Sequence, residues 1–319
     1  MDSLVAQLQF SAAITGPICL MLVLGMGLKR LGVINDNFIE VGSKLVFQVT
    51  LPAMLFLSIV SSKHDFAASS GLIVYGLISG IGVFLLSFWL SNKLVSDRRD
   101  RGVTIQGGFR ANTAIIALAY VANAYGNDGV ALAAIYVAAT TLLYNVQAVI
   151  ALSAYDQTTT GLQSLRVVGR TLTRNPLIIA ILLGVACYAL AVPIPAMVTD
   201  VGRYFANMTL PLALLCTGGS LDIRALRNDS NAAWLACSIK LIVAPLLVTI
   251  GALAVGFSGI ELGILFLMNA APTAAASYVM ARAMGGNASL AANIIALTTL
   301  GSLLTCTLGL FILNSLQLI

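Results

Sequence analysis

The sequence has few charged residues. Only 9% of its 319 residues are Asp, Glu, Lys or Arg, whereas 59% are hydrophobic, and the mean hydropathy is +0.97. A soluble domain carries roughly 25% charged residues. This shortage excludes an ordinary soluble domain and predicts a protein that crosses a membrane several times.

The residues that build metal, nucleotide and catalytic sites are scarce as well. His64 is the one histidine, and the five cysteines are spread through apolar runs, so we expect neither a metal site nor a disulfide framework. The sequence has no Gly-Lys-Ser/Thr motif to hold a nucleotide phosphate, and no nucleophile and base stand out as a pair. We therefore expect no cofactor and no enzymatic activity. The net charge of +5 comes from short loops and does not indicate a nucleic-acid partner.

What the sequence has instead is a series of long apolar segments. About 20 apolar residues cross the hydrocarbon core of a bilayer as one helix. By that measure we expect an all-α polytopic membrane protein with ten transmembrane helices. The segments cover about 7–28, 38–61, 68–93, 103–125, 129–153, 175–193, 198–220, 230–255, 261–284 and 288–315.

Basic residues are distributed unevenly between the two sides of these helices. Cytoplasmic loops of membrane proteins carry an excess of Lys and Arg. Alternate loops hold almost all of them, whereas the opposite side has Lys63 and little else. We therefore expect a location in the cytoplasmic membrane with both termini outside. The residues on the basic side are Lys29, Arg30, Lys93, Arg98, Arg99, Arg101, Arg166, Arg170, Arg174, Arg224 and Arg227.

The two halves of the chain share short matches in the same order. Each half holds five segments, so the second half would be inserted upside down, which is the inverted-repeat plan of many secondary transporters. We expect repeats at 1–155 and 175–319. Between them, the basic linker at 156–174 is either an amphipathic helix on the membrane surface or a solvated loop. The matched pairs are Leu22–Gly25 with Ile181–Gly184, Leu51–Pro52 with Leu210–Pro211, Lys44 with Arg203, Ala111–Ala114 with Ala271–Ala274, Leu132–Ala134 with Leu290–Ala292, and Thr140–Leu142 with Thr298–Leu300.

The stretch Asn269–Ser277, with the sequence NAAPTAAAS, interrupts the ninth segment. Pro272 removes a hydrogen-bond donor from the helix, and inside a bilayer such a break needs protein or a wet cavity around it. Through the repeat, its counterpart in the fourth segment is Asn112, a good N-cap residue. We expect both segments to break there. Their second halves would begin at Thr113 and Thr273 and direct two positive helix ends at one anion.

Residues at these breaks are the candidate substrate ligands. For the Asn, Thr and Ser side chains, the alternative is hydrogen bonding between helices, which is common in membranes. For Pro272, the alternative is a simple kink. The candidates are Arg110, Asn112, Thr113, Asn269, Pro272, Thr273 and Ser277.

Coupling to protons or sodium is harder to predict, because no carboxylate lies clearly at the centre of a segment. Lys240 lies deep in the eighth segment and could have a functional or a structural role. Asp65 and Glu261, both near the outer side, are the acids best suited to titrate. Sodium could instead be held by backbone carbonyls at the breaks, and uniport or exchange are further alternatives.

Five motifs stand out, and each occurs once along the chain. They are LPAMLFLSI at Leu51–Ile59, FRANTAIIALAY at Phe109–Tyr120, NPLIIAILLG at Asn175–Gly184, LPLALLCTGGSL at Leu210–Leu221 and APTAAASYVMA at Ala271–Ala281. With these motifs the chain resembles the auxin efflux carrier family of transporters over its whole length. The central loop is short, as in the bacterial members. Unlike many members, the chain has no proline between Thr104 and Tyr125.

The resemblance implies a secondary active transporter for small organic anions, such as malonate or auxin-like acids. It also implies ten helices in two inverted five-helix repeats, in which the broken helices four and nine cross. Helices one, two, six and seven would form a scaffold. The other six helices would form a transport domain that moves in an elevator-type alternating-access mechanism. We further expect a homodimer. The alternatives are a sodium-coupled carrier of the bile-acid symporter type and a receptor or channel without carrier activity.

Overall fold

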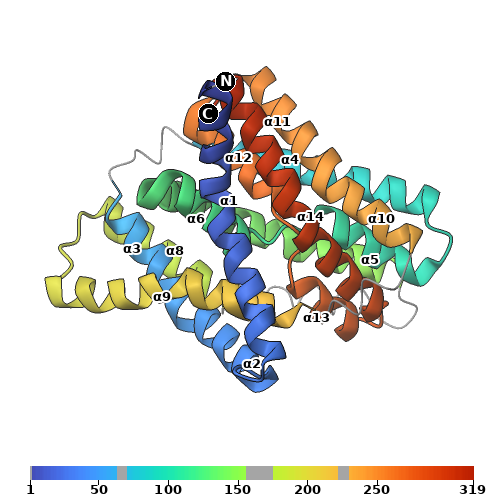
Figure 1. The fold of residues 1–319 in the computed structure, drawn as a ribbon, viewed down its shortest axis with the longest axis horizontal. Helices are drawn as coiled ribbons and strands as arrows, with labels where there is room; N and C mark the ends of the chain where they lie inside the picture. Colours follow the sequence, from blue (N-terminus) through green and yellow to red (C-terminus); the bar gives the residue numbers. More distant parts are fainter. Residues whose placement is uncertain (1, 63–69, 156–174, 222–229) are drawn as a thin grey trace.

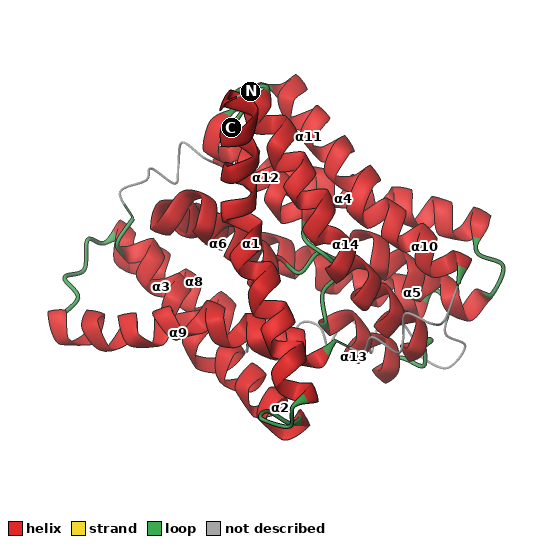
Figure 2. Cartoon of the chain, in the orientation of Figure 1, coloured by secondary structure: helices red, strands yellow, loops and turns green. Residues whose placement is uncertain are grey.

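The computed structural model describes residues 2–62, 70–155, 175–221 and 230–319 (Figure 1). Within these ranges every regular element is a helix, as Figure 2 shows, in agreement with the predicted all-α class. The predicted linker at 156–174 lies outside the described residues. The elements are α1 (Asp2–Arg30), α2 (Asp36–Leu45), η1 (Val46–Thr50), α3 (Leu51–Val60), α4 (Ser70–Leu94), α5 (Arg98–Phe109), η2 (Thr113–Ala117), α6 (Leu118–Ser153), α8 (Pro176–Ala189), α9 (Ala196–Ser220), α10 (Asn231–Ser238), η4 (Ile239–Val243), α11 (Ala244–Val255), α12 (Gly259–Ala270), α13 (Ala276–Ala283) and α14 (Ala288–Ser315), where η marks a π-helical turn.

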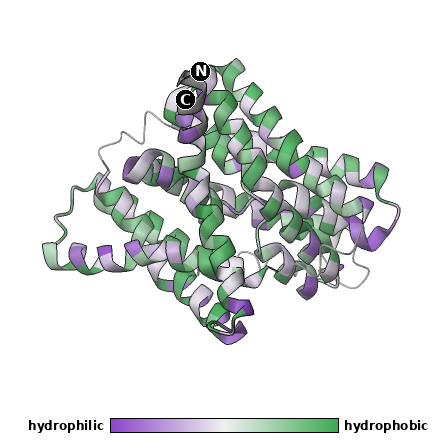
Figure 3. Ribbon diagram, in the orientation of Figure 1, coloured by the Kyte–Doolittle hydropathy of each residue, from purple (hydrophilic) through white to green (hydrophobic). Residues whose placement is uncertain are grey.

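Several helical stretches are long and apolar enough to cross a membrane. Large hydrophobic side chains also cover the outside of the molecule: Leu20 is 71% exposed and Leu182 is 64% exposed. Figure 3 shows hydrophobic residues along the helices and hydrophilic ones mainly near helix ends and loops. Such a surface suits lipid, so the chain is a multi-pass membrane protein. Crossing by all ten predicted segments stays a prediction. Within the described residues, the stretches that are long and apolar enough are these six: Gln9–Arg30, Asp36–Val60, Ser70–Leu94, Thr113–Ser153, Asn231–Val255 and Ala288–Ser315.

Two of the π-helical turns stand directly before a proline. Pro52 and Pro245 have no N–H to donate to the carbonyl four residues earlier. The residue before Pro52, Leu51, donates instead to the Val46 carbonyl, five residues back, and the residue before Pro245 makes the matching bond in η4. These wider turns change the direction in which neighbouring side chains leave the helix. Lys240 lies in one of them.

The helices pack in two groups. α1, α2, α3, α8 and α9 contact one another, while α4, α5, α6 and α10 to α14 form the second group. Contacts of α1 with α6 and α14, and of α3 with α6, join the groups. Figure 1 shows α1 beside α14, with both chain termini at the same end of the molecule. The interrupted segments described below belong to the second group.

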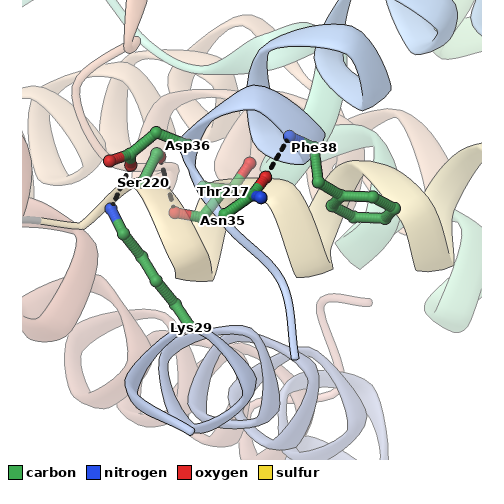
Figure 4. Close-up of polar contacts among 6 residues, drawn as sticks. All are labelled: Lys29, Asn35, Asp36, Phe38, Thr217 and Ser220. Atoms are coloured by element: carbon green, nitrogen blue, oxygen red, sulfur yellow. Dashed lines mark hydrogen bonds and ion pairs between the residues drawn. The ribbon is translucent and has the colours of Figure 1, made fainter. Parts of the chain in front are cut away.

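Close backbone approach holds α1 against α9. A Cβ added at Gly218 would overlap the carbonyl of Leu22. Beyond the end of α1, Lys29 Nζ pairs with Asp36 Oδ1 at 2.6 Å, as Figure 4 shows. Asn35 caps α2 there, since its Oδ1 accepts from the backbone amide of Phe38 at 2.9 Å. The α1–α2–α9 corner is therefore fixed by packing and local capping.

Gly218→Ala is expected to lower thermal stability, because the added methyl forces α1 away from α9. Overpacking of this kind costs about 1–3 kcal/mol. Gly27→Ala is the matched control, since a Cβ at Gly27 would have no atom within 4 Å. Alanine at that helical position should leave stability unchanged or raise it slightly. Thermal unfolding of both purified variants checks this, and equal melting temperatures would contradict the packing argument.

Candidate functional site

Both predicted interruptions are present in the helices. α5 ends at Phe109, and helical structure resumes with η2 at Thr113. α12 ends at Ala270, and helical structure resumes with α13 at Ala276. The predicted start of the second half-helix at Thr273 was therefore wrong, because the chain around that residue is bonded to the other interruption.

An isolated antiparallel bridge between Ala111 and Thr273 joins the two interruptions. Helix ends leave backbone donors and acceptors without partners, and in a membrane these must be satisfied within the protein. Two backbone bonds across the bridge do so. They run from Asn112 N to Pro272 O at 2.7 Å and from Ala274 N to Arg110 O at 3.0 Å. Each interruption therefore stabilises the other, which explains why the two lie together. We call the place where they meet the crossing.

The carbonyl of Asn269, near the end of α12, is bonded by a side chain from another helix. In an unbroken helix it would accept from the Thr273 amide. That amide instead donates to Thr298 Oγ1 on α14 at 3.1 Å. Lys240 Nζ takes the free position and donates to the Asn269 carbonyl at 3.0 Å. Lys240 is only 1% exposed, so the structure brings this residue to the second interruption.

The side chains of Asn269 and Thr273 hold helices together. Asn269 Nδ2 donates to the Leu265 carbonyl at 2.9 Å and to Tyr136 Oη at 3.3 Å. Thr273 Oγ1 donates to the Gly107 carbonyl of α5 at 2.7 Å. α12 ends between these two residues, so they do not lie on one continuous helix. The bonds to Tyr136 and Gly107 match the interhelical alternative raised from the sequence, whereas the bond to Leu265 lies within α12.

Asn112 and Thr113 are buried but keep their side chains free. Asn112 is 7% exposed and Thr113 is 4% exposed, and neither side chain forms a hydrogen bond within the described residues. The predicted N-cap bond of Asn112 was wrong. An N-cap residue has an extended backbone, whereas Asn112 has φ −79° and ψ 67°. The first bond of η2 runs from Ala117 N to Asn112 O, so the amides of Thr113–Ile116 lack intrahelical partners.

The start of α13 has fewer free backbone amides than the start of η2. Pro272 was expected in its first turn, but lies in the extended stretch before it. Ser277 N donates to Ala274 O at 2.9 Å, and Tyr278 N donates to Ala275 O at 3.1 Å. These short-range bonds use amides that the start of η2 leaves free. The two positive helix ends are therefore unequal, and the start of η2 offers more free backbone amides to an anion.

Arg110 directly follows α5 and is buried beside α6 and α13. Its Nη2 donates to Asn145 Oδ1 at 2.9 Å, and its Nη1 points to Met280 Sδ. With its oxygen turned toward Arg110, the Gln106 amide accepts from Nη1 at 3.2 Å and donates to the Ser277 carbonyl at 3.2 Å. The Ser277 hydroxyl is buried without a hydrogen-bond partner. Arg110 forms no ion pair with a carboxylate in the described ranges.

Of the two predicted acids, the structure describes only Glu261. Glu261 lies in the first turn of α12, at the end of the helix away from the interruption. Asp65 lies outside the described residues. The described residues contain no group of three His, Cys, Asp or Glu side chains that could hold a metal ion.

Sequence reasoning missed several polar residues at this site. Gln106 and Asn145 interrupt apolar segments, and that signal could have found them. Thr298 belongs to one of the matched pairs of the repeat, but its bond to the Thr273 amide had no sequence signal. Tyr136 had none either. Its ring lies against Gly76, where an added Cβ would overlap it.

Comparison with known proteins agrees with this architecture. Residues 15–310 match a family described as "Membrane transport protein". An "Uncharacterized transporter" of Methanothermobacter thermautotrophicus is 24% identical over 298 residues, covering 91% of this chain and 94% of its own length. The family match includes both interruptions and all residues assembled around them. The chain therefore belongs to the membrane transport protein family, the auxin efflux carrier family of transporters.

Proposed function

We propose that this transporter carries small organic anions, carboxylates such as malonate or auxin-like acids, by secondary active transport. The binding site is the crossing between η2 and the extended stretch before α13. The observation that carries the proposal is a surplus of buried positive charge beside free donors. Arg110 and Lys240 are buried there without a carboxylate partner in the described residues, and Asn112 and Thr113 have unused polar side chains.

Electrostatics favours an anion as the ligand. Burying a charge without a counterion costs several kcal/mol. An incoming carboxylate would supply the missing negative charge and accept hydrogen bonds from Asn112, Thr113 and the free amides of η2. The positive end of η2 adds to this attraction. The same positive charges would repel a cationic substrate.

The packing supports an elevator-type mechanism. The side chains of the crossing come from the two interruptions and from α5, η2, α6, η4, α12, α13 and α14, which pack within the second group of helices. We propose that this group moves as the transport domain against a scaffold of α1, α2, α3, α8 and α9. In this proposal ten spans form two inverted repeats, at 1–155 and 175–319. The protein would be a homodimer in the cytoplasmic membrane with both termini outside.

Ligand binding gives the first test. Malonate and indole acetate should raise the melting temperature of the purified protein, whereas the neutral amides malonamide and indole acetamide should not. A ligand that binds the native state stabilises it by about 2.7 kcal/mol at 100 times its dissociation constant. The paired amides keep shape and size and remove the charge. Equal stabilisation by acid and amide would argue against an anion site.

Counterflow separates a carrier from a receptor or channel. Proteoliposomes preloaded with the unlabelled stabilising acid should take up the labelled acid faster than unloaded ones, because each return step of a carrier brings a substrate back. A receptor gives no uptake, and a channel gives no acceleration. Uptake that requires sodium would favour the bile-acid symporter type.

A further inference from the structure

The carboxyl end of α12 has carbonyls that would suit a cation. Pro272 has no N–H, so the Met268 carbonyl loses its helical partner. The Asn269 carbonyl loses the Thr273 amide, which donates to Thr298 instead. The end of a helix carries a partial negative charge of roughly one half, and here it is buried. An end of this kind is stabilised by a positive charge close to it.

Lys240 supplies that charge from the neighbouring helix. Its Nζ lies 3.0 Å from the Asn269 carbonyl oxygen, and the residue is almost completely buried. Within the described residues it has no acidic partner, so a salt bridge does not explain its place. An ammonium has three donors, and the Asn269 carbonyl takes one of them. The contact is with the backbone end of α12 rather than with another charged side chain.

Two glycines of α5 let that helix pack closely against α10 and η4, the part of the chain that carries Lys240. Ile239, next to Lys240, packs on Gly108 of α5, where an added Cβ would lie 3.2 Å from its Cγ2 atom. A Cβ at Gly107 would lie 3.2 Å from the Cβ of Ala236. The wide turn of η4 before Pro245 directs Lys240 across this contact. Two glycines and a π-helical turn thus place one ammonium at the interruption.

We propose that the Lys240 ammonium is a tethered cation that fills the position of a coupling sodium ion at the end of α12, so that this transporter works without sodium. Carbonyl oxygens of interrupted helices are the ligands that hold sodium in other secondary transporters. Here one of them is already bonded to Nζ. Lys240 is a positioning residue, because it fixes the Asn269 end of the interruption and does not contact the substrate. The coupling part of the proposal rests on the proposed function.

Chemical rescue of Lys240→Ala tests the cation position without any substrate. This substitution removes three carbons and the nitrogen, which together correspond to propylammonium. We expect the variant to melt below wild type, and propylammonium chloride to raise its melting temperature by about 2–4 °C, a shift worth roughly 1 kcal/mol. Sodium chloride should raise it in the same direction, and choline chloride controls for ionic strength. Lys240→Met is the matched variant, since methionine fills the stem space without a charge and should gain nothing.

Uptake gives the second arm. Wild-type proteoliposomes should transport the stabilising carboxylate equally in sodium and choline buffers. Lys240→Ala should lose at least about tenfold in rate, equivalent to roughly 1.4 kcal/mol, and recover with propylammonium. The proposal is overturned if no cation stabilises Lys240→Ala, if Lys240→Met is rescued equally, or if wild-type uptake needs sodium. Should Lys240→Ala not fold, the sodium dependence of the wild type decides.

The thermal rescue and the uptake measurement also test the tethered cation and the proposed function separately. If the wild type carries no carboxylate, the proposed function fails, while the thermal rescue still reports on the cation position. If transport is found but rescue is not, the tethered cation fails and the proposed function stands.

Discussion

Asn112→Asp is expected to reduce anion uptake by at least about 100-fold, equivalent to roughly 2.7 kcal/mol. The side chain lies buried at the open start of η2 and has no hydrogen-bond partner among the described residues. Aspartate has nearly the same shape, but it replaces the amide donor with a second acceptor and adds a negative charge. It would therefore repel a carboxylate from the donors that should bind it. The initial uptake rate in proteoliposomes is the measurement.

Stability provides the control for this variant. A carboxylate at the start of a helix is favourable, so Asn112→Asp should melt at or above the wild-type temperature. Asn112→Ser removes the amide without adding charge and should lose much less activity. Uptake by Asn112→Asp within twofold of wild type would remove Asn112 from the binding site. A large fall in melting temperature would instead point to a structural role.

The interruptions were predictable because local chemistry determines them. Pro272 removes a donor from an apolar helix, and the repeat identified Asn112 as its counterpart. The bonds made across the crossing were not predictable in the same way. Whether the Thr273 amide bonds to Asn269 or to Thr298 depends on where α14 lies, and α14 begins only at Ala288. This competition moved the start of α13 beyond Thr273.

Burial and partnership likewise required the three-dimensional structure. The depth of Lys240 followed from its place in an apolar segment, but its bond to the end of α12 depends on the η4 turn and on Gly107 and Gly108. The predicted cap bond of Asn112 failed because the backbone there follows the bridge to the other interruption. The residue types indicated the site, but which polar groups keep free hydrogen-bonding positions depends on the bonds made across the crossing.

Arg110→Met is expected to reduce uptake of the carboxylate by about 100-fold without lowering the melting temperature. Removing an interaction with a buried charge costs about 2–5 kcal/mol of binding. The folded protein should tolerate the change, because Arg110 has no carboxylate partner in the described ranges and a buried charge carries a desolvation cost that methionine avoids. Uptake rate and thermal unfolding, measured on the same preparation, check both parts.

Arg110→Lys separates charge from geometry. Lysine keeps the positive charge but cannot reproduce the planar fork that reaches Asn145, so an intermediate uptake rate is expected. If Arg110 only held α5 to α6 and α13, both variants would lose stability and activity together. Lost activity with retained or increased stability instead means that the folded protein keeps an unfavourable charge for its ligand. The acid and amide pairs then give the decisive comparison: Arg110→Met should lose the preference for malonate over malonamide, because the charge that distinguishes the two ligands is gone.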